Sequence, residues 1–189
     1  MNCDTLLDVL AGAPIIASVK TEADLEAALG SDVGVIFLLF GNILNIRDLA
    51  ARVHAAGKLV FVHLDLVEGL ASREVSTDFI ARSTAADGVI STKAALTRRA
   101  RELGLLAIQR FFLLDSMALS NIEHHFSQEA ADVIEVLPGL MPQITAWVAQ
   151  VTGKPVIAGG LICYKEDVTA ALGAGAVAVS TTNSGVWEM

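Results

Sequence analysis

Cysteine is scarce in this sequence, and neither cysteine belongs to a recognisable motif. Cys3 and Cys163 lie far apart in the chain and match no metal-binding or redox spacing. Isolated thiols are typical of proteins in a reducing compartment, because disulfides form mainly in secreted chains. We therefore expect a cytoplasmic protein. A chain of 189 residues buries roughly 70% of its unfolded surface on folding and needs no disulfide or metal for stability.

Long hydrophobic runs and an export signal are also missing. The most apolar run, residues 33–40, is far shorter than the ~20 residues that a membrane-spanning helix needs. The first ten residues contain two aspartates and no cation, whereas a secretory signal begins with positive charge. We therefore expect neither a membrane anchor nor export.

Positive charge is in the minority, and aromatic residues make up only 5% of the chain. Thirteen Lys and Arg stand against 21 Asp and Glu, which gives a formal net charge of −8. A chain of this charge is not attracted as a whole to nucleic acid or to anionic membranes. Any contact with RNA would therefore have to be local.

Short apolar, β-branched runs alternate with helical stretches along the whole chain. They predict strands at residues 14–18, 33–38, 58–64, 88–91, 105–110, 132–136, 155–158 and 176–180. Near-continuous apolar strands are typical of a parallel sheet buried on both faces, and about eight strand–helix units favour closure into a barrel. We predict an α/β protein with one domain over residues 1–189, a compact TIM-like (β/α)8 barrel. An open doubly wound sheet is the alternative.

Two helices between these strands have clear boundary signals. The segment 21–29 opens with Thr-Glu-Ala-Asp, a pattern that places a capping hydroxyl three positions before a carboxylate. The segment 43–56 ends at Gly57, which easily adopts the left-handed conformation that stops a helix. Its expected apolar stripe consists of Ile43, Ile46, Leu49, Ala50 and Val53.

Polar residues follow the predicted strands at their carboxyl ends, where barrels of this type bind ligands. Three of them are cations, Lys20, Lys93 and Arg110, and we expect them to converge on one mouth of the barrel. Their convergence would favour an anionic ligand, because charged donors form the strongest hydrogen bonds to phosphate oxygens.

Glycines and hydroxyl residues follow the last two predicted strands. Gly159 and Gly160 follow strand seven, and Ser180 and Thr181 end strand eight. Many barrels hold a phosphate at this position on backbone N–H groups, and glycine lets the backbone approach the anion closely. Taken one at a time, the two segments also fit a tight turn and a helix cap. Together, on adjacent strands, they favour a small phosphorylated ligand.

His63, Asp65 and Glu68 lie at the end of the third predicted strand. They could supply ligands to a divalent metal, but a catalytic zinc site usually has about three protein ligands, often with more than one imidazole. We therefore expect no metal. Carboxylates also accept hydrogen bonds from ligand hydroxyls without any chemistry, which suits a glycerol-like ligand. His63 could equally be a satisfied core histidine.

Basic residues concentrate between residues 73 and 110, where seven cations stand against four carboxylates. Arg98, Arg99 and Arg101 lie close together on a predicted helix and could form one exposed basic ridge that contacts RNA. No aromatic platform for stacking on bases accompanies them. The composition alone therefore favours a solvated helix face over an RNA contact.

Long irregular motifs in the chain resemble those of the glycerol-3-phosphate responsive antiterminators, bacterial regulators of glycerol uptake and catabolic operons. The resemblance covers nearly the whole chain. The stretches that carry it are PIIA (14–17), VIFLLFG (35–41), FVHLDLVEGL (61–70), ADGVISTK (86–93), LGLLAIQRFFLLDSMAL (103–119), EVLPG (135–139), IAGGLI (157–162) and STTN (180–183).

The resemblance implies a regulator, with no catalysis and no cofactor beyond glycerol 3-phosphate as effector. Its RNA partner would be the leader mRNA of glycerol operons, where binding prevents premature termination of transcription. The implied phosphate contacts are Lys20, Lys93, Arg110, Gly159, Gly160, Ser180 and Thr181. We assign His63, Asp65, Glu68 and Glu135 to the polyol part of the ligand as a hypothesis.

A phosphosugar isomerase, epimerase or aldolase is the alternative function, because such enzymes share the fold and the phosphate cradle. An enzyme would need a placed base or a Schiff-base lysine, for which Asp65, Glu68 and Lys93 are available. A homo-oligomer is left open by the sequence.

Overall fold

The computed structural model describes residues 2–126 and 129–189, and its eight strands form a closed parallel barrel. Each strand pairs with the next in sequence, and the last pairs with the first. The strands are β1 (Ile15–Val19), β2 (Val35–Leu38), β3 (Leu59–His63), β4 (Gly88–Ser91), β5 (Leu106–Phe112), β6 (Val133–Leu137), β7 (Val156–Gly159) and β8 (Ala178–Thr181). The predicted barrel is confirmed.

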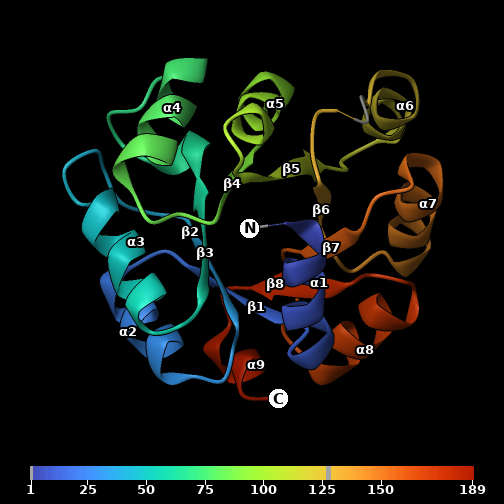
Figure 1. The fold of residues 1–189 in the computed structure, drawn as a ribbon. Helices are drawn as coiled ribbons and strands as arrows, with labels where there is room; N and C mark the ends of the chain where they lie inside the picture. The colour runs from blue at the N-terminus through green and yellow to red at the C-terminus, as the bar shows by residue number, and fades with distance from the viewer. Residues whose placement is uncertain (1, 127–128) are drawn as a thin grey trace.

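Helices surround the strands (Figure 1). They are α1 (Cys3–Gly12), α2 (Glu22–Gly30), α3 (Ile46–Ala55), α4 (Glu74–Ser83), α5 (Ala94–Glu102), α6 (Ser116–His125), α7 (Pro142–Thr152), α8 (Lys165–Gly173) and α9 (Ser184–Trp187), with a 3-10 turn η1 (Leu64–Leu66). None of the helices in the described ranges is long and apolar enough to span a membrane.

The boundaries of α2 and α3 follow from local chemistry. The Thr21 side chain accepts a hydrogen bond from the Asp24 N–H, which confirms the predicted helix start. Gly57 has a φ of +73°, the left-handed conformation expected after α3.

The prediction that Ile43 belongs to this helix was wrong. Its N–H donates to the Glu68 carbonyl and its side chain is 44% exposed, because the loop after β2 pairs with the loop after β3.

Side chains alternate between the inside of the barrel and the helix layer, as the two-residue period of strands requires. The part of the interior next to α1 is apolar. It includes Phe37 and Phe61, whose rings meet edge to face with centroids 5.7 Å apart. Toward the carboxyl ends of the strands the interior becomes polar, with His63, Arg110 and Glu135 at or below 7% exposure. This change of character places the polar groups at one end of the barrel.

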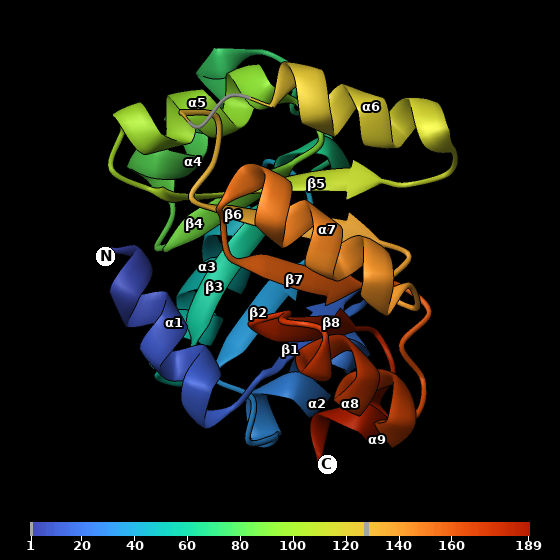
Figure 2. The same ribbon diagram turned by 90° about the vertical axis from the view of Figure 1, so that its right-hand side faces the viewer.

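The other end of the barrel is closed by α1. Leu6 and Leu10 of this helix are fully buried and pack in the same cluster as the interior strand residues. Figure 2 shows α1 at the amino ends of the strands. The carboxyl end is therefore the open mouth, and the site must be sought there.

Candidate functional site

A cavity of about 630 Å³ lies at the carboxyl end of the barrel. The residues that line it follow β1, β2, β3, β5, β6, β7 and β8 or end these strands. Six of the eleven predicted ligand residues line it, namely Lys20, Arg110, Glu135, Gly160, Ser180 and Thr181. The segments after β7 and β8, to which we assigned the phosphate, both reach it.

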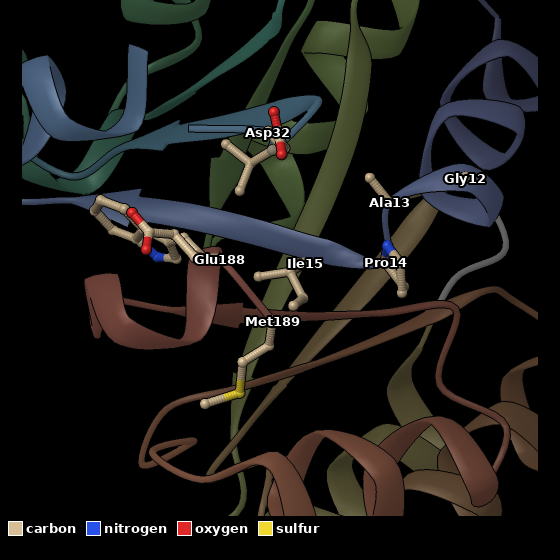
Figure 3. Close-up of a pocket in the computed structure, with 9 residues that line it drawn as sticks. Gly12, Ala13, Pro14, Ile15, Asp32, Glu188 and Met189 are labelled. Carbon is tan, nitrogen blue, oxygen red and sulfur yellow. The ribbon is translucent and has the colours of Figure 1, made fainter. Parts of the chain in front are cut away.

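A smaller cavity of about 220 Å³ lies on the amino side, between the turn after α1 and the end of the chain (Figure 3). Asp32 and Glu188 bring carboxylates to it, and the described residues that line it include no Lys or Arg. An anion would be repelled there, so the large cavity is the candidate site.

Arg110, Glu135 and Ser180 form a buried hydrogen-bonded set at the bottom of the large cavity. Arg110 lies opposite Glu135 in the β5–β6 register, and its Nε donates to Glu135 Oε2 at 2.6 Å. Ser180 Oγ donates to Glu135 Oε1, also at 2.6 Å. The Nη groups of Arg110 donate to no other described residue, so the guanidinium keeps free donors at the cavity.

Gly159 is needed for this arrangement because of space. A Cβ atom at this position would lie 2.5 Å from Ser180 Oγ and 2.7 Å from Glu135 Oε1. Any side chain would therefore displace the carboxylate or the hydroxyl. The prediction placed Gly159 beside a ligand phosphate, whereas the structure places it against the Glu135–Ser180 hydrogen bond.

Backbone N–H groups beside the cavity lack acceptors. Those of Gly160, Leu161, Ile162 and Thr182 donate to nothing in the described part of the chain. Gly160 and Leu161 have positive φ values, +74° and +62°, which turn the loop after β7 back on itself. Successive N–H groups of this kind form anion-binding concavities.

The hydroxyl groups of the predicted phosphate segment are used within the protein. Ser180 Oγ is bonded to Glu135, and Thr181 Oγ1 donates to the Ile162 carbonyl at 2.7 Å. Thr181 therefore ties the loop after β8 to the loop after β7. Both residues hold the backbone in place, and the donors left for an anion are backbone N–H groups.

The three predicted cations do not converge on one point. Lys20 and Arg110 line the cavity, but Lys93 does not. Lys93 Nζ contacts Asp65 Oδ1 at 3.2 Å and also Ser72 Oγ. Lys93 is the second residue after β4, and its side chain is held by residues that follow β3 instead of reaching the cavity.

Asp65 is surrounded by donors of the protein itself. Its carboxylate accepts from the Thr92 N–H at 2.8 Å, from the hydroxyls of Ser91 and Thr92, and from Lys93. Burial raises the pKa of Asp65, but these donors outweigh it and hold the pKa below its ordinary value. Glu68 is exposed on the same loop. The described residues contain no group of three potential metal ligands.

His63 is 3% exposed, and its Nδ1 has no hydrogen-bond partner among the described residues. Its Nδ1 lies 3.9 Å from Asp65 Oδ2, too far for a hydrogen bond. Burial, then the positive charge of Arg110, lowers the pKa of His63 to about 4. The imidazole is therefore neutral at physiological pH and keeps an unpaired polar atom inside the barrel.

The expected basic ridge is mostly neutralised by carboxylates. Arg99 forms ion pairs with Asp78 and Glu102, and Arg101 Nε lies 2.8 Å from Asp132 Oδ1. Arg98 is exposed, and no ion pair to it occurs among the described residues. The ridge is thus one outward arginine beside two that brace α5 against neighbouring segments.

The predicted ligand residues did not include Ser18, Leu161, Ile162 or Thr182 individually, although the segments after strands seven and eight were assigned to the phosphate. Ser18 is 4% exposed, lines the cavity, and its hydroxyl has no partner among the described residues. Its position could have been found, since it lies two residues after the interior residue Ile16 on the same strand face. The N–H groups of the other three carry no side-chain signal, so no residue type points to them.

Comparison with known proteins places this chain in a family. The glycerol-3-phosphate responsive antiterminator family matches residues 15–187. A protein of Escherichia coli strain K12, the uncharacterized protein YgcP, is 44% identical over 184 residues, which cover 97% of this chain and 96% of that protein.

Solved structures agree with this match. The glycerol uptake operon antiterminator regulatory protein of Listeria monocytogenes is 35% identical with a TM-score of 0.88, covering 92% of this chain and 94% of its own. A glycerol uptake operon antiterminator-related protein of Thermotoga maritima is 33% identical with a TM-score of 0.82. The match covers 93% of this chain and 98% of that protein.

More distant structures share only the barrel. Deoxyribose phosphate aldolase of Aeropyrum pernix, for example, is 18% identical with a TM-score of 0.67, covering 98% of this chain and 96% of its own. Identity at this level shows only a shared fold, and function has to be argued from the residues of the site. With the family match over most of its length, this chain belongs to the glycerol-3-phosphate responsive antiterminator family.

Proposed function

We propose that this protein binds glycerol 3-phosphate and, in the bound form, the leader mRNA of glycerol operons, where it prevents premature termination of transcription. The observation that carries the proposal is one cavity that combines the free Nη donors of Arg110 with unpaired backbone N–H groups. The metabolite and the mRNA meet in the bacterial cytoplasm, where we place the protein.

The phosphate of the ligand binds at the loops after β7 and β8. The N–H groups of Gly160, Leu161, Ile162 and Thr182 supply neutral donors, and Lys20 and Arg110 supply positive charge. This combination suits a phosphomonoester, which carries close to two charges at neutral pH. The carboxylate of Glu135 limits how near the phosphate comes to the buried end of Arg110, because like charges repel.

The glycerol part of the ligand faces the interior polar groups. Ser18 Oγ is unpaired at the cavity, and His63 Nδ1 is unpaired inside the barrel. Both oxygens of Glu135 already accept one hydrogen bond, yet each keeps a further lone pair for a ligand hydroxyl. We keep His63 and Glu135 as polyol contacts, whereas the donors around Asp65 support a role in holding the loop after β4.

RNA binding depends on the ligand only if the ligand binds the RNA-competent conformation more tightly than the other one. Of the predicted ridge, we retain Arg98 as an RNA contact, because its side chain is exposed and makes no ion pair with the described residues. Arg99 and Arg101 are held by carboxylates and serve to position α5.

We propose that the protein is not an enzyme. A Schiff-base lysine is activated by burial or by a neighbouring cation, but Lys93 is 45% exposed and paired with Asp65, and Lys20 is exposed. Asp65, the other candidate, is held by at least four donors and is not free to take a proton from a substrate.

Calorimetric titration of glycerol 3-phosphate into the purified protein tests this proposal, with glycerol and inorganic phosphate as controls. We expect saturable heat with the phosphoester and no continuing heat. Arg110→Lys keeps the charge but loses the planar fork, and we expect it to weaken binding at least tenfold. Lys154→Ala, between α7 and β7, should leave the affinity unchanged.

A gel shift with the leader RNA of a glycerol operon tests the second half of the proposal. Saturating glycerol 3-phosphate should strengthen the shift, most clearly at low salt. No shift at low salt with the ligand present would rule out the antitermination mechanism. Heat that continues after saturation would instead show turnover, and abolition of that turnover by Asp65→Asn would identify an enzyme.

A further inference from the structure

The large cavity has two chemically different sides. Its polar side is built by β1, β7 and β8, which are neighbours in the closed barrel, and carries Ser18, Lys20 and the unpaired N–H groups. Its opposite side is built by β2, β3, β5 and β6 and the segments after them. Arg110 and Glu135 lie at the bottom of this side. The rest of it carries five large apolar side chains, which we call the apolar wall: Leu39, Leu66, Phe112, Leu114 and Leu137.

The apolar wall is open to solvent. Leu66, Phe112 and Leu114 are 46%, 52% and 83% exposed. Single exposed apolar residues are ordinary, but several gathered in one concave site indicate a surface that is covered in use. Its continuity with the cavity of the unpaired N–H groups indicates that one ligand covers both.

Glycerol 3-phosphate is too small and too polar to do so. A cavity of about 630 Å³ lies within the range of roughly 300–1,000 Å³ that takes drug-sized ligands. The polar side, together with Arg110 and Glu135 at the bottom of the cavity, can satisfy the phosphate and hydroxyls of glycerol 3-phosphate. The exposed side chains of the apolar wall, Leu66, Phe112 and Leu114, would then remain in water.

We propose that the cavity takes a glycerol phosphoester that carries an apolar acyl or alkyl substituent on the glycerol, with the phosphate on the polar side and the substituent along the apolar wall. This inference rests on the proposed function and extends it to the class of ligand. A nucleobase fits less well, because the side chains of the apolar wall offer no donor or acceptor to its polar edge, which would stay unpaired.

A chain-length series tests the inference. Glycerol 3-phosphate and its 1-acetyl, 1-butyryl and 1-hexanoyl esters are titrated calorimetrically below their aggregation concentrations. Each methylene buried on the apolar wall should raise the affinity about fourfold, since burial is worth ~0.8 kcal/mol per CH₂. We expect the hexanoyl ester to bind more than tenfold tighter than the acetyl ester.

Phe112→Ser and Leu114→Ser should remove the increase in affinity with the chain length of the ester. The affinity for glycerol 3-phosphate itself should stay unchanged. Both side chains are more than half exposed, so the fold should tolerate the changes, which circular dichroism verifies. Val151→Ser on α7 is the matched control, because Val151 is 38% exposed and lies outside the cavity. In this variant the affinity should still increase with the chain length of the ester.

The outcomes separate this inference from the proposed function. If glycerol 3-phosphate binds and the ester series is flat or falls with chain length, only the inference is overturned. If no compound of the series binds, both fail. If Phe112→Ser and Leu114→Ser abolish the leader-RNA shift but preserve the ester series, the apolar wall contacts RNA and the inference is overturned.

Discussion

Arg110 and Glu135 face each other across β5 and β6, and their side chains are 7% and 0% exposed. Arg110 therefore binds an internal carboxylate through Nε while its Nη groups remain at the cavity. The fixed carboxylate holds the orientation of the guanidinium before any ligand arrives, and such preorganisation lowers the entropic cost of binding. The same burial makes the pair sensitive to loss of one partner.

Arg110→Ala should lower the free energy of unfolding by about 3–5 kcal/mol, because it leaves the buried charge of Glu135 without a partner. The double variant Arg110→Met/Glu135→Leu removes both charges and should recover most of that loss without recovering ligand binding. Urea unfolding and calorimetry measure the two effects separately. A single variant that loses less than about 1 kcal/mol would contradict the pairing.

Gly159→Ala should disturb the hydrogen bond between Ser180 and Glu135, because the new methyl group overlaps both partner atoms. We expect a loss of about 1–3 kcal/mol in stability and weaker ligand binding. The control is Gly173→Ala in α8, where a Cβ meets no atom within 4 Å. That variant should be neutral or slightly stabilising, since alanine favours helix. Similar losses in both variants would refute the steric argument.

His63 should make stability fall with pH between 6.5 and about 4, its ordinary and folded pKa values. In this window the unfolded chain binds a proton that the folded protein does not, so the free energy of unfolding decreases as the pH falls. Between pH 7 and pH 5 the loss should be about 2 kcal/mol. The lowered pKa of Asp65 acts at still lower pH.

Urea unfolding of the protein and of His63→Gln at pH 7 and pH 5 checks this dependence. The variant should lose less stability over the interval, because the other titrating groups contribute equally to both proteins. An identical pH dependence would show that folding does not lower the pKa of His63.

The barrel was predictable from sequence because each strand is a short apolar run, and its closure follows from their number. Side-chain chemistry also led to Arg110 and Glu135, which are buried charged residues of their strands. The segments after β7 and β8 were also predicted as the phosphate site. The contacts of the Lys93 side chain and the identity of the unpaired N–H groups, those of Gly160, Leu161, Ile162 and Thr182, were not predictable. They depend on which loop a flexible side chain contacts and on which N–H groups lack acceptors, and both are properties of the folded chain.

Lys20→Ala should weaken the binding of glycerol 3-phosphate severalfold, whereas Lys93→Ala should change it less than twofold. The reason is that Lys20 lines the cavity and Lys93 is held by Asp65 and Ser72. Calorimetry of both variants under the same buffer conditions measures the difference. A larger effect for Lys93 would mean that it turns toward the ligand when the phosphate binds.

Arg98→Ala should reduce the salt dependence of RNA binding by about one counterion, that is by 0.7–0.9 in the slope of log K against log [salt]. Binding of glycerol 3-phosphate should not change. Arg52→Ala serves as the control, because Arg52 is an α3 arginine tied to Glu22 and Glu26. Equal slopes for Arg98→Ala and the unmodified protein would remove Arg98 from the RNA surface.

Because Leu6 and Leu10 pack into the amino end of the barrel, the cavity is reached from the carboxyl end. A small molecule must enter and leave through the loops at the carboxyl end. Any macromolecule seated over those loops would trap the ligand and slow its escape. The order of binding would then be fixed, with the metabolite first and the larger partner second. Release would follow the reverse order, so the lifetime of the complex would set how long the metabolite signal persists.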